Sequence, residues 1–403
     1  MSGLYIVRQP IYTRTQHAIG YKLWFHPEAG DDSLDRDQPH DHSPAILDAL
    51  IEIGFDSLVG ARSAFIRFSR AFICAGHILP LPVERVVIEL GDYAHPDERL
   101  INAVQRFNDM GYTIALDNFM LTDPVSPMLE FANVVKIDAG ALDGRELRRQ
   151  IRAMQRFEKI KVLAAGVDSQ ALYEVCREIG FHYFQGHFFT GAKPGLHQRV
   201  PSNRIVMMRL LAELQKPNAS VARLEALVSK DVGLSYKLLR YINSAFFGLP
   251  RTVDSIQRAI VFLGTKAIQK WATLLVLARV DDKPNELMVT ALVRAKMCEL
   301  LARVKRFNNV DVCFTAGLLS VLEALLDTPM EQVLSHLSLT ADLNRALLFR
   351  EGEVGAILQN VIQYELGALD EIDLSELKPR DYREAYVQSV KWASDNARVL
   401  IGE

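Results

Sequence analysis

The chain has few cysteines, and no two of them stand at metal-ligand spacing. Four occur in 403 residues and none forms a CxxC pair: Cys74, Cys176, Cys298 and Cys313. This pattern argues against a disulfide framework and against a cysteine-based zinc site, and it fits a reducing compartment.

Long apolar runs and an excess of one charge are also missing. No stretch approaches 18 consecutive apolar residues, and the N-terminal MSGLYIVRQP lacks the pattern of a signal peptide. The 46 basic and 49 acidic residues give a net charge of -3, so a nucleic-acid-binding surface would have to be local. We therefore expect a cytoplasmic protein with no membrane span and no nucleic-acid partner.

The residues that are present can fill sizeable cores. Hydrophobic residues make up 49% of the chain, and the length predicts two or three domains at about 150 residues each. Histidine is unevenly placed: only His336 of the ten lies beyond residue 200.

The first 190 residues alternate between strand-like and helix-like stretches. Eight strands are predicted from apolar runs rich in Val, Ile, Tyr and Phe: 5–12, 19–25, 64–68, 85–90, 113–117, 134–138, 161–167 and 182–189. Helices are predicted at 45–58, 97–110, 142–157 and 169–179, the first opened by Ser43-Pro44. The first two strands follow each other closely and predict a hairpin, while the rest alternate with helices. This order is typical of a modified, TIM-like (β/α) barrel.

The second half is helical in pattern. The stretch Gly191–Pro201 shows neither helical nor strand periodicity, which predicts a linker. We therefore expect an α/β domain at 1–195, a linker at 196–204 and an all-α domain at 205–403.

Polar residues end several of the predicted strands. They are Glu89, Asp117-Asn118, Lys136 with Asp138, and Gln185. In a (β/α) barrel such positions are the usual catalytic ones, and this cluster has the chemistry to hold a divalent cation and orient a water molecule. The alternative is that these carboxylates only cap helices or form salt bridges.

At these residues the sequence resembles the EAL domain of cyclic di-GMP phosphodiesterases, over about residues 1–195. The resemblance rests on ordered motifs: Gln9-Pro10-Ile11-Tyr12, Ile19-Gly20-Tyr21, Val86-Val87-Ile88-Glu89-Leu90, Asp117-Asn118-Phe119, Val135-Lys136-Ile137-Asp138, Ala165-Gly166-Val167 and Phe184-Gln185-Gly186-His187-Phe188-Phe189. It implies a cyclic di-GMP site that includes Glu89, Asp117, Lys136 and Gln185.

Five positions depart from the pattern that the resemblance implies. Lys22 stands where the first metal-binding glutamate is expected, His26 replaces a phosphate-binding arginine, and Arg67 replaces a metal-binding asparagine. Asn118 replaces the second aspartate of a pair, and Ala165 replaces a glutamate.

These exchanges have a consistent physical meaning. Divalent metals need oxygen ligands, whereas ammonium and guanidinium groups only donate hydrogen bonds. Lys22 and Arg67 beside Glu89 and Asp117 therefore predict internal ion pairs instead of a metal site. From this we expect no catalysis, no metal and no cofactor, and we do not expect cyclic di-GMP binding. The alternatives are a sensor that binds without turnover, or residual phosphodiesterase activity.

The helical half resembles the HDOD domain, a relative of HD-type metal phosphohydrolases, over about residues 205–395. The resemblance rests mainly on residues 231–247, where Asn243-Ser244 ends an apolar helix, and continues through Ser255–Gly264. Where the HD dipeptide would stand, the chain reads Gly317-Leu318-Leu319-Ser320. With His336 as the one histidine of this half, metal chemistry is not expected here.

An altered EAL domain followed by an HDOD domain resembles a bacterial regulatory family linked to cyclic di-GMP networks and motility. The resemblance implies a signalling protein that acts through protein partners. The helical half would offer the binding surface, and the barrel would serve as a support or homodimerisation module.

Overall fold

The computed structural model describes residues 4–27, 42–91, 96–120, 127–190, 202–216, 220–230, 232–243, 253–278, 283–337 and 339–397. The chain forms two compact units. The barrel unit comprises residues 1–189, 364–370 and 378–387, and the helical unit comprises residues 190–363, 371–377 and 388–403.

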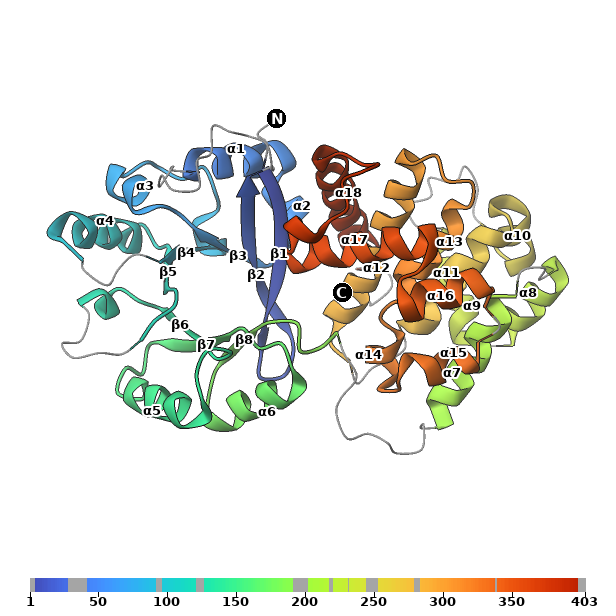
Figure 1. Cartoon of the computed structure of the whole chain (residues 1–403), viewed down its shortest axis with the longest axis horizontal. Helices are drawn as coiled ribbons and strands as arrows, with labels where there is room; N and C mark the ends of the chain where they lie inside the picture. The colour runs from blue at the N-terminus through green and yellow to red at the C-terminus, as the bar shows by residue number, and fades with distance from the viewer. Residues whose placement is uncertain are drawn as a thin grey trace. The chain divides into compact units, whose positions relative to one another are not determined.

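Eight strands close into a barrel in sequence order (Figure 1). They are β1 (Leu4–Thr13), β2 (Ala18–Pro27), β3 (Ser63–Arg67), β4 (Val86–Leu90), β5 (Thr113–Leu116), β6 (Val134–Asp138), β7 (Lys161–Ala165) and β8 (Tyr183–Gln185). β1 is antiparallel to β2 and to β8, and every other neighbouring pair is parallel. The predicted barrel and its opening hairpin are confirmed.

β8 is shorter than the predicted strand 182–189. It ends at Gln185 because Gly186 adopts φ +156° and lies so close to Val167 that an added Cβ would stand 2.0 Å from the Val167 oxygen. Glycine is therefore the residue that fits where the chain leaves β8.

Helices lie outside the ring of strands (Figure 1). They are α1 (Ser43–Ile53), α2 (Phe55–Val59), α3 (Arg70–Ala75), α4 (Glu98–Asp109), α5 (Gly144–Met154) and α6 (Gln170–Ile179), with short 3₁₀ turns at 83–85 and 127–130. The single predicted helix 45–58 is wrong, because Gly54 at φ +89° breaks it into α1 and α2. Ser43 is not the predicted N-cap either; its hydroxyl accepts a hydrogen bond from the Ser69 amide at 2.9 Å.

One layer of the barrel interior is apolar and sets the position of the site above it. This layer consists of Ile11, Phe65, Val87, Ala115, Val134 and Leu163. Side chains two residues apart on a strand point to the same face. The residues two positions beyond this layer on β3 to β7 therefore also point to the interior side: Arg67, Glu89, Asp117, Lys136 and Ala165.

The barrel unit includes two segments from near the C-terminus. The Tyr364 hydroxyl donates to the Ile6 carbonyl oxygen at 3.2 Å, and the Arg8 amide donates to the Tyr386 hydroxyl at 3.1 Å. The Tyr5 and Tyr364 rings meet edge to face at 5.7 Å. These contacts attach both segments to β1.

The helical unit is built from α-helices. They are α7 (Ser202–Leu214), α8 (Val221–Ser229), α9 (Val232–Ile242), α10 (Ile256–Leu263), α11 (Thr265–Leu277), α12 (Asn285–Val304), α13 (Val310–Leu319), α14 (Leu322–Leu326), α15 (Met330–Ser335), α16 (Ala341–Phe349) and parts of α17 (Gly352–Leu366) and α18 (Pro379–Ala397). The predicted all-α second half is confirmed.

Two features hold this unit together. α12 and α13 pack closely because Gly317 lies against the α12 backbone, where an added Cβ would stand 2.5 Å from the Arg294 carbonyl oxygen. The Asn243 side chain both donates to and accepts from the Val253 backbone at 2.7 Å, which fixes the two ends of the connection between α9 and α10.

Some predicted features cannot be placed. The linker prediction at 196–204 lies outside the described residues up to residue 201, and α7 begins at Ser202. Asp231 and residues 244–247 of the HDOD-like stretch also lie outside them. His336 is exposed at the end of α15.

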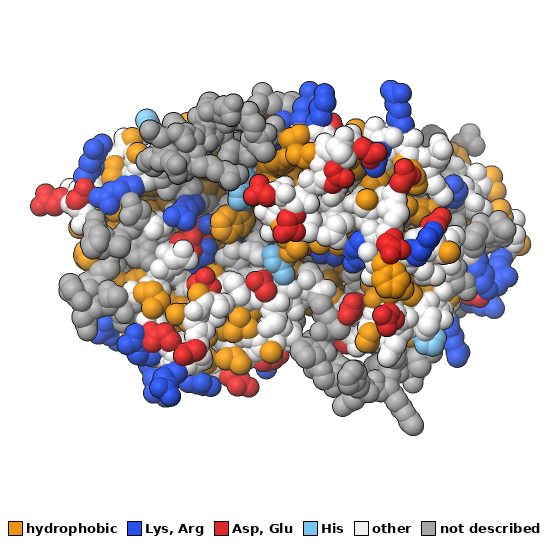
Figure 2. Space-filling model, viewed as in Figure 1, with side chains coloured by type: hydrophobic (Ala, Val, Ile, Leu, Met, Phe, Trp, Pro, Cys, Tyr) orange, Lys and Arg blue, Asp and Glu red, His pale blue; other side chains and the backbone are white. Residues whose placement is uncertain are grey.

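The surface carries both signs of charge. Acidic and basic side chains are interspersed on the face drawn in Figure 2. None of the described helices combines the length and apolar composition that crossing a membrane requires.

Candidate functional site

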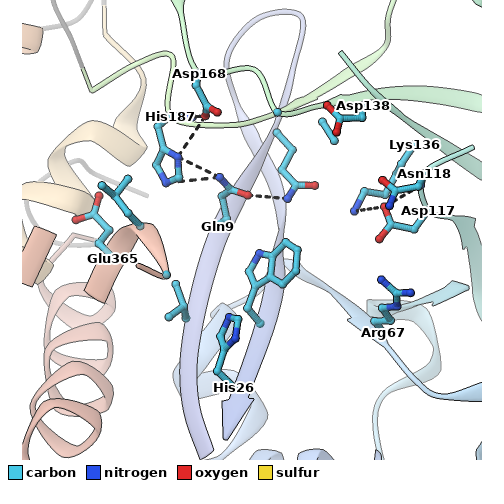
Figure 3. A pocket seen from close by; sticks show the side chains of 17 residues that line it. Gln9, His26, Arg67, Asp117, Asn118, Lys136, Asp138, Asp168, His187 and Glu365 are labelled. Carbon is cyan, nitrogen blue, oxygen red and sulfur yellow. Dashed lines mark hydrogen bonds and ion pairs between the residues drawn. The ribbon is translucent and has the colours of Figure 1, made fainter. Parts of the chain in front are cut away.

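A cavity of about 630 Å³ lies in the barrel unit where several strands end, and Figure 3 shows the side chains that line it. This volume falls within the range of about 300–1,000 Å³ that small-molecule sites occupy. In Figure 3, Lys136, Asp117 and Asn118 lie together on one side, whereas His187, Asp168 and Gln9 lie on another. Glu365, Leu366 and Gly367 from the C-terminal segment of the unit also line the cavity.

Two lysines and two carboxylates form a buried charge cluster on the first side. Lys136 Nζ lies 2.7 Å from Glu89 Oε1 and 3.1 Å from Asp117 Oδ1. Lys22 Nζ also pairs with Glu89, through Oε2, and lies 3.8 Å from Asp117 Oδ2. All four side chains are at least nine-tenths buried. The cluster thus neutralises its own charge inside the protein.

Burial and mutual charge shift the pKa values in this cluster. Burial lowers the pKa of Lys22 well below its ordinary value, and the charge of Lys136 lowers it further while Asp117 opposes the shift. Burial likewise lowers the pKa of Lys136 against the opposing effect of Asp117. For Asp117, burial alone would raise the pKa, but the charges of Lys136 and Lys22 outweigh it and lower the pKa.

Arg67 lies beside this cluster and is more exposed than its members. Its guanidinium rests against Gly91, where an added Cβ would stand 2.0 Å from a guanidinium nitrogen. Asn118 follows Asp117 at φ +50°, a left-handed conformation that asparagine tolerates better than most residues. Arg67 and Asn118 both line the cavity. On this side of the cavity the two lysines are therefore buried cations, and Arg67 is an accessible one.

His26 and Trp24 form an aromatic edge of the cavity. Their rings stack with an interplanar angle of 14° and a centroid distance of 6.3 Å. The Trp24 ring also lies 4.8 Å from Lys22 Nζ, a cation–π contact. Burial lowers the pKa of His26 against the opposing charge of Asp370.

A series of hydrogen-bonded polar side chains lies on the other side of the cavity. Gln185 Nε2 donates to Gln9 Oε1 at 2.6 Å, and Gln9 Nε2 lies 3.3 Å from His187 Nδ1. The His187 backbone amide donates to Asp168 Oδ1 at 3.0 Å, and the ring Nδ1 lies 3.4 Å from the same oxygen. Hydrogen bonding from His187 lowers the pKa of Asp168.

The sequence reasoning placed most of these residues and missed others. In the structure Glu89, Asp117, Lys136 and Lys22 form the charge cluster, and the cavity is lined by Arg67, Asn118, His26, Ala165 and Gln185. Asp138 lines it as well, but its Oδ1 accepts from the amides of Gly140 and Ala141 and closes a turn.

His187 and Asp168 were not singled out. Their position in the sequence could have indicated a shared site. Asp168 follows the end of β7 and His187 follows the end of β8, and the carboxyl ends of neighbouring parallel strands meet at one edge of a sheet.

A divalent metal, which the EAL resemblance implies, does not fit the arrangement. The carboxylates of Glu89 and Asp117 are engaged by the two lysine ammonium groups. Within the described part of the chain, no three His, Cys, Asp or Glu side chains are grouped so that they could hold an ion. We therefore derive no chemistry through a metal.

Models of two protein families match the chain. Residues 67–194 match the EAL domain, and residues 200–345 match the HDOD domain. The chain therefore contains an EAL domain followed by an HDOD domain.

Two relatives are similar along nearly the whole chain. One is "Cyclic di-GMP phosphodiesterase CdgJ" of Vibrio cholerae, 29% identical over 99% of this chain and 94% of that protein. The other is "Uncharacterized protein YuxH" of Bacillus subtilis, 24% identical over 96% of this chain and 98% of that protein.

The first relative corrects the expectation that this chain is not an enzyme. That expectation rested on five substituted positions and on the assumption that loss of the metal ligands ends activity. The likeness to a protein named as a phosphodiesterase extends over the whole chain and overturns it.

One solved structure has a low similarity to this chain. It is an EAL domain protein of Listeria monocytogenes EGD-e, 18% identical, with a TM-score of 0.37, covering 46% of this chain and 87% of that chain.

Proposed function

We propose that this chain is a cyclic di-GMP phosphodiesterase that binds the dinucleotide in the barrel cavity. The full-length relative named for this activity supports the reaction. The observation that carries the site is a cavity of about 630 Å³ with cations at Arg67 and Lys136 and a stacked aromatic pair, Trp24 and His26. Cations suit the phosphates, and aromatic planes suit the bases.

The cavity also contains a group suited to proton transfer. Imidazole is the side chain that most often serves as a general base, and Asp168 holds the His187 ring at the cavity wall. In the proposed reaction, the oxygen of a water molecule forms a new bond to phosphorus while one P–O bond to a ribose oxygen breaks. The proton of the water passes through the imidazole to the departing ribose oxygen. Arg67 balances the negative charge that develops on the phosphate.

Product formation by the purified full-length chain tests the proposal. We expect linear dinucleotide from cyclic di-GMP, with a rate that a chelator leaves unchanged. Arg67→Gln removes a charged phosphate donor and should raise KM about tenfold. His187→Ala should lower kcat by at least about a hundredfold while leaving KM within about twofold.

A matched control variant is Arg149→Gln, which changes an exposed ion pair on α5. It should leave both constants unchanged. Absence of linear product with and without Mg²⁺ or Mn²⁺ would overturn the proposal. Product that forms only with metal would overturn the histidine route while leaving the phosphodiesterase assignment in place.

The second part of this proposal is that the chain acts through protein partners in the cytoplasm, in a pathway linked to motility. Exposed apolar side chains on two packed helices support it: Tyr236 on α9 and Val261 and Phe262 on α10 are 61–77% exposed. We expect Phe262→Ser to abolish co-purification of a protein partner from the native cell without altering product formation. Equal recovery of that partner by both proteins would contradict this surface.

A further inference from the structure

A second cavity lies in the helical unit, and its described lining includes no residue of the proposed reaction. It measures about 340 Å³ and is lined by residues of α7, α11, α13 and α16 and by their connections. Neither the sequence motifs nor the comparisons assign it a role.

One face of α11 forms a wall of this cavity. Lys266, Gln269, Lys270 and Thr273 line it, and their spacing of three and four residues places them on one side of the helix. Gln215 Nε2 donates to the fully buried Thr273 hydroxyl at 3.0 Å, and Gln269 Nε2 donates to the Leu214 carbonyl oxygen at 3.0 Å. These bonds fix α11 against the end of α7, so the wall is preorganised.

The two lysines of this wall are held in place by one carboxylate. Lys266 Nζ lies 3.3 Å and Lys270 Nζ 3.2 Å from oxygens of Asp311 at the start of α13. Lys270 Nζ also lies 3.6 Å from the buried Glu299. An ammonium group has three donors, so the pairing of Lys266 with Asp311 leaves Lys266 capacity for a further anionic acceptor.

Positive charge exceeds negative charge around the cavity. The charged residues of its described lining are three lysines and one carboxylate: Lys216, Lys266, Lys270 and Asp311. The whole chain carries a net charge of -3, so this local surplus is not a property of the protein in general. It favours an anionic occupant.

The backbone adds to this preference. α11 begins at Thr265 after Gly264, and α13 begins at Val310 after Asn309, and neither start has a side-chain cap in the described structure. Thr265 and Asn309 both line the cavity. The free N–H groups of a first helical turn favour anions such as phosphate.

The volume of the cavity limits the size of the molecule that can bind in it. The cavity has little more than half the volume of the barrel cavity, and its floor includes the apolar side chains of Leu318 and Leu343. We propose that it binds a small phosphomonoester of about the size of one nucleotide, with the phosphate at Lys266 and Lys270 and the organic part over the apolar floor.

Binding of guanosine and adenosine 5′-monophosphate to the full-length chain tests this site by calorimetry, with inorganic phosphate and guanosine as partial probes. We expect a monophosphate to bind at least tenfold more tightly than guanosine. Lys266→Gln, at a side chain that is 75% exposed, should raise the dissociation constant about tenfold without unfolding the chain. Lys230→Gln, an exposed lysine after α8 that does not line the cavity, should leave it unchanged.

Other outcomes would overturn the proposal and separate it from the proposed reaction. Loss of binding in Arg67→Gln but not in Lys266→Gln would place the monophosphate in the barrel cavity. Equal affinity for guanosine, or tight binding only of a single-stranded oligonucleotide, would replace a phosphomonoester site by a nucleoside or nucleic-acid surface. Loss of phosphodiesterase activity alone would not affect this site.

Discussion

Lys136 Nζ lies within 3.1 Å of both Glu89 and Asp117, so one buried ammonium group joins carboxylates from two neighbouring strands of the barrel. Lys22 approaches the same two carboxylates from β2. Because these buried charges balance one another, the members of this cluster depend on one another.

Lys136→Met should destabilise the protein strongly. It removes one of two cations from buried Glu89 and Asp117, and breaking a buried ion pair costs about 3 kcal/mol or more. Urea denaturation of the full chain measures the change. Lys161→Met, at the exposed start of β7, should change stability by less than about 0.5 kcal/mol. Similar losses in both variants would show that the cluster does not contribute as described.

Lys22→Glu should create a binding site for Mn²⁺. The substitution places a third carboxylate beside Glu89 and Asp117, and hard cations prefer such oxygen ligands. We expect the variant to be less stable than the wild type without metal, because like charges then stand together. Millimolar Mn²⁺ should raise its melting temperature by several degrees.

The wild-type chain and Lys22→Met serve as the two references for this metal test. Neither should respond to Mn²⁺. A wild-type shift equal to that of the glutamate variant would contradict the view that lysine excludes metal here.

Gly317→Ala should destabilise the helical unit. The added Cβ would stand 2.5 Å from the Arg294 carbonyl oxygen, and backbone atoms of α12 cannot yield without separating the two helices. We expect a loss of about 2 kcal/mol, read as a lower urea midpoint. Gly144→Ala at the start of α5 is the control, because its Cβ would meet nothing closer than an Arg148 nitrogen at 3.6 Å. A stable Gly317 variant would argue against this helix contact.

Glu299→Gln should reduce the pH dependence of stability at acid pH. Burial tends to raise the pKa of Glu299, but the charge of Lys270 and contacts with Lys296 and Arg303 outweigh it and lower the pKa below 4.5. Its stabilising contribution is therefore complete above pH 4.5 and is lost as the pH falls through the lower folded-state value.

Denaturation at several pH values measures that dependence. The variant should be about 2 kcal/mol less stable than the wild type at pH 7, and the difference should shrink as the pH falls below 4.5. A difference that stays constant across this range would show that Glu299 does not titrate with folding.

The positions of the charged residues could be predicted because they follow from strand periodicity. Val87 and Glu89 lie two residues apart on β4, as Val134 and Lys136 do on β6. Because side chains two residues apart on a strand point to the same face, Glu89 and Lys136 point into the barrel next to the apolar layer that contains Val87 and Val134. An ion pair between Lys22 and Glu89 was expected from charge, whereas the pairing of Lys136 with Asp117 was not predicted.

Other features could not be derived in this way. The contact between Asp168 and His187 depends on two loops that meet only when the barrel closes. Tyr364 reaches β1 across 358 residues of sequence, and no local pattern records such a contact. The break at Gly54 was missed because apolar spacing continues through it, although the backbone conformation does not.

The contacts of Tyr364 and Tyr386 with β1 also bear on how the protein is made. β1 is synthesised before the other strands of its barrel, yet the side chains that bind Ile6 and Arg8 are added more than 350 residues later. Domains usually fold one after another during synthesis. Here the first strand of the barrel unit has to wait for residues 364–370 and 378–387, so this unit is complete only after the intervening helices α7 to α16 have been synthesised.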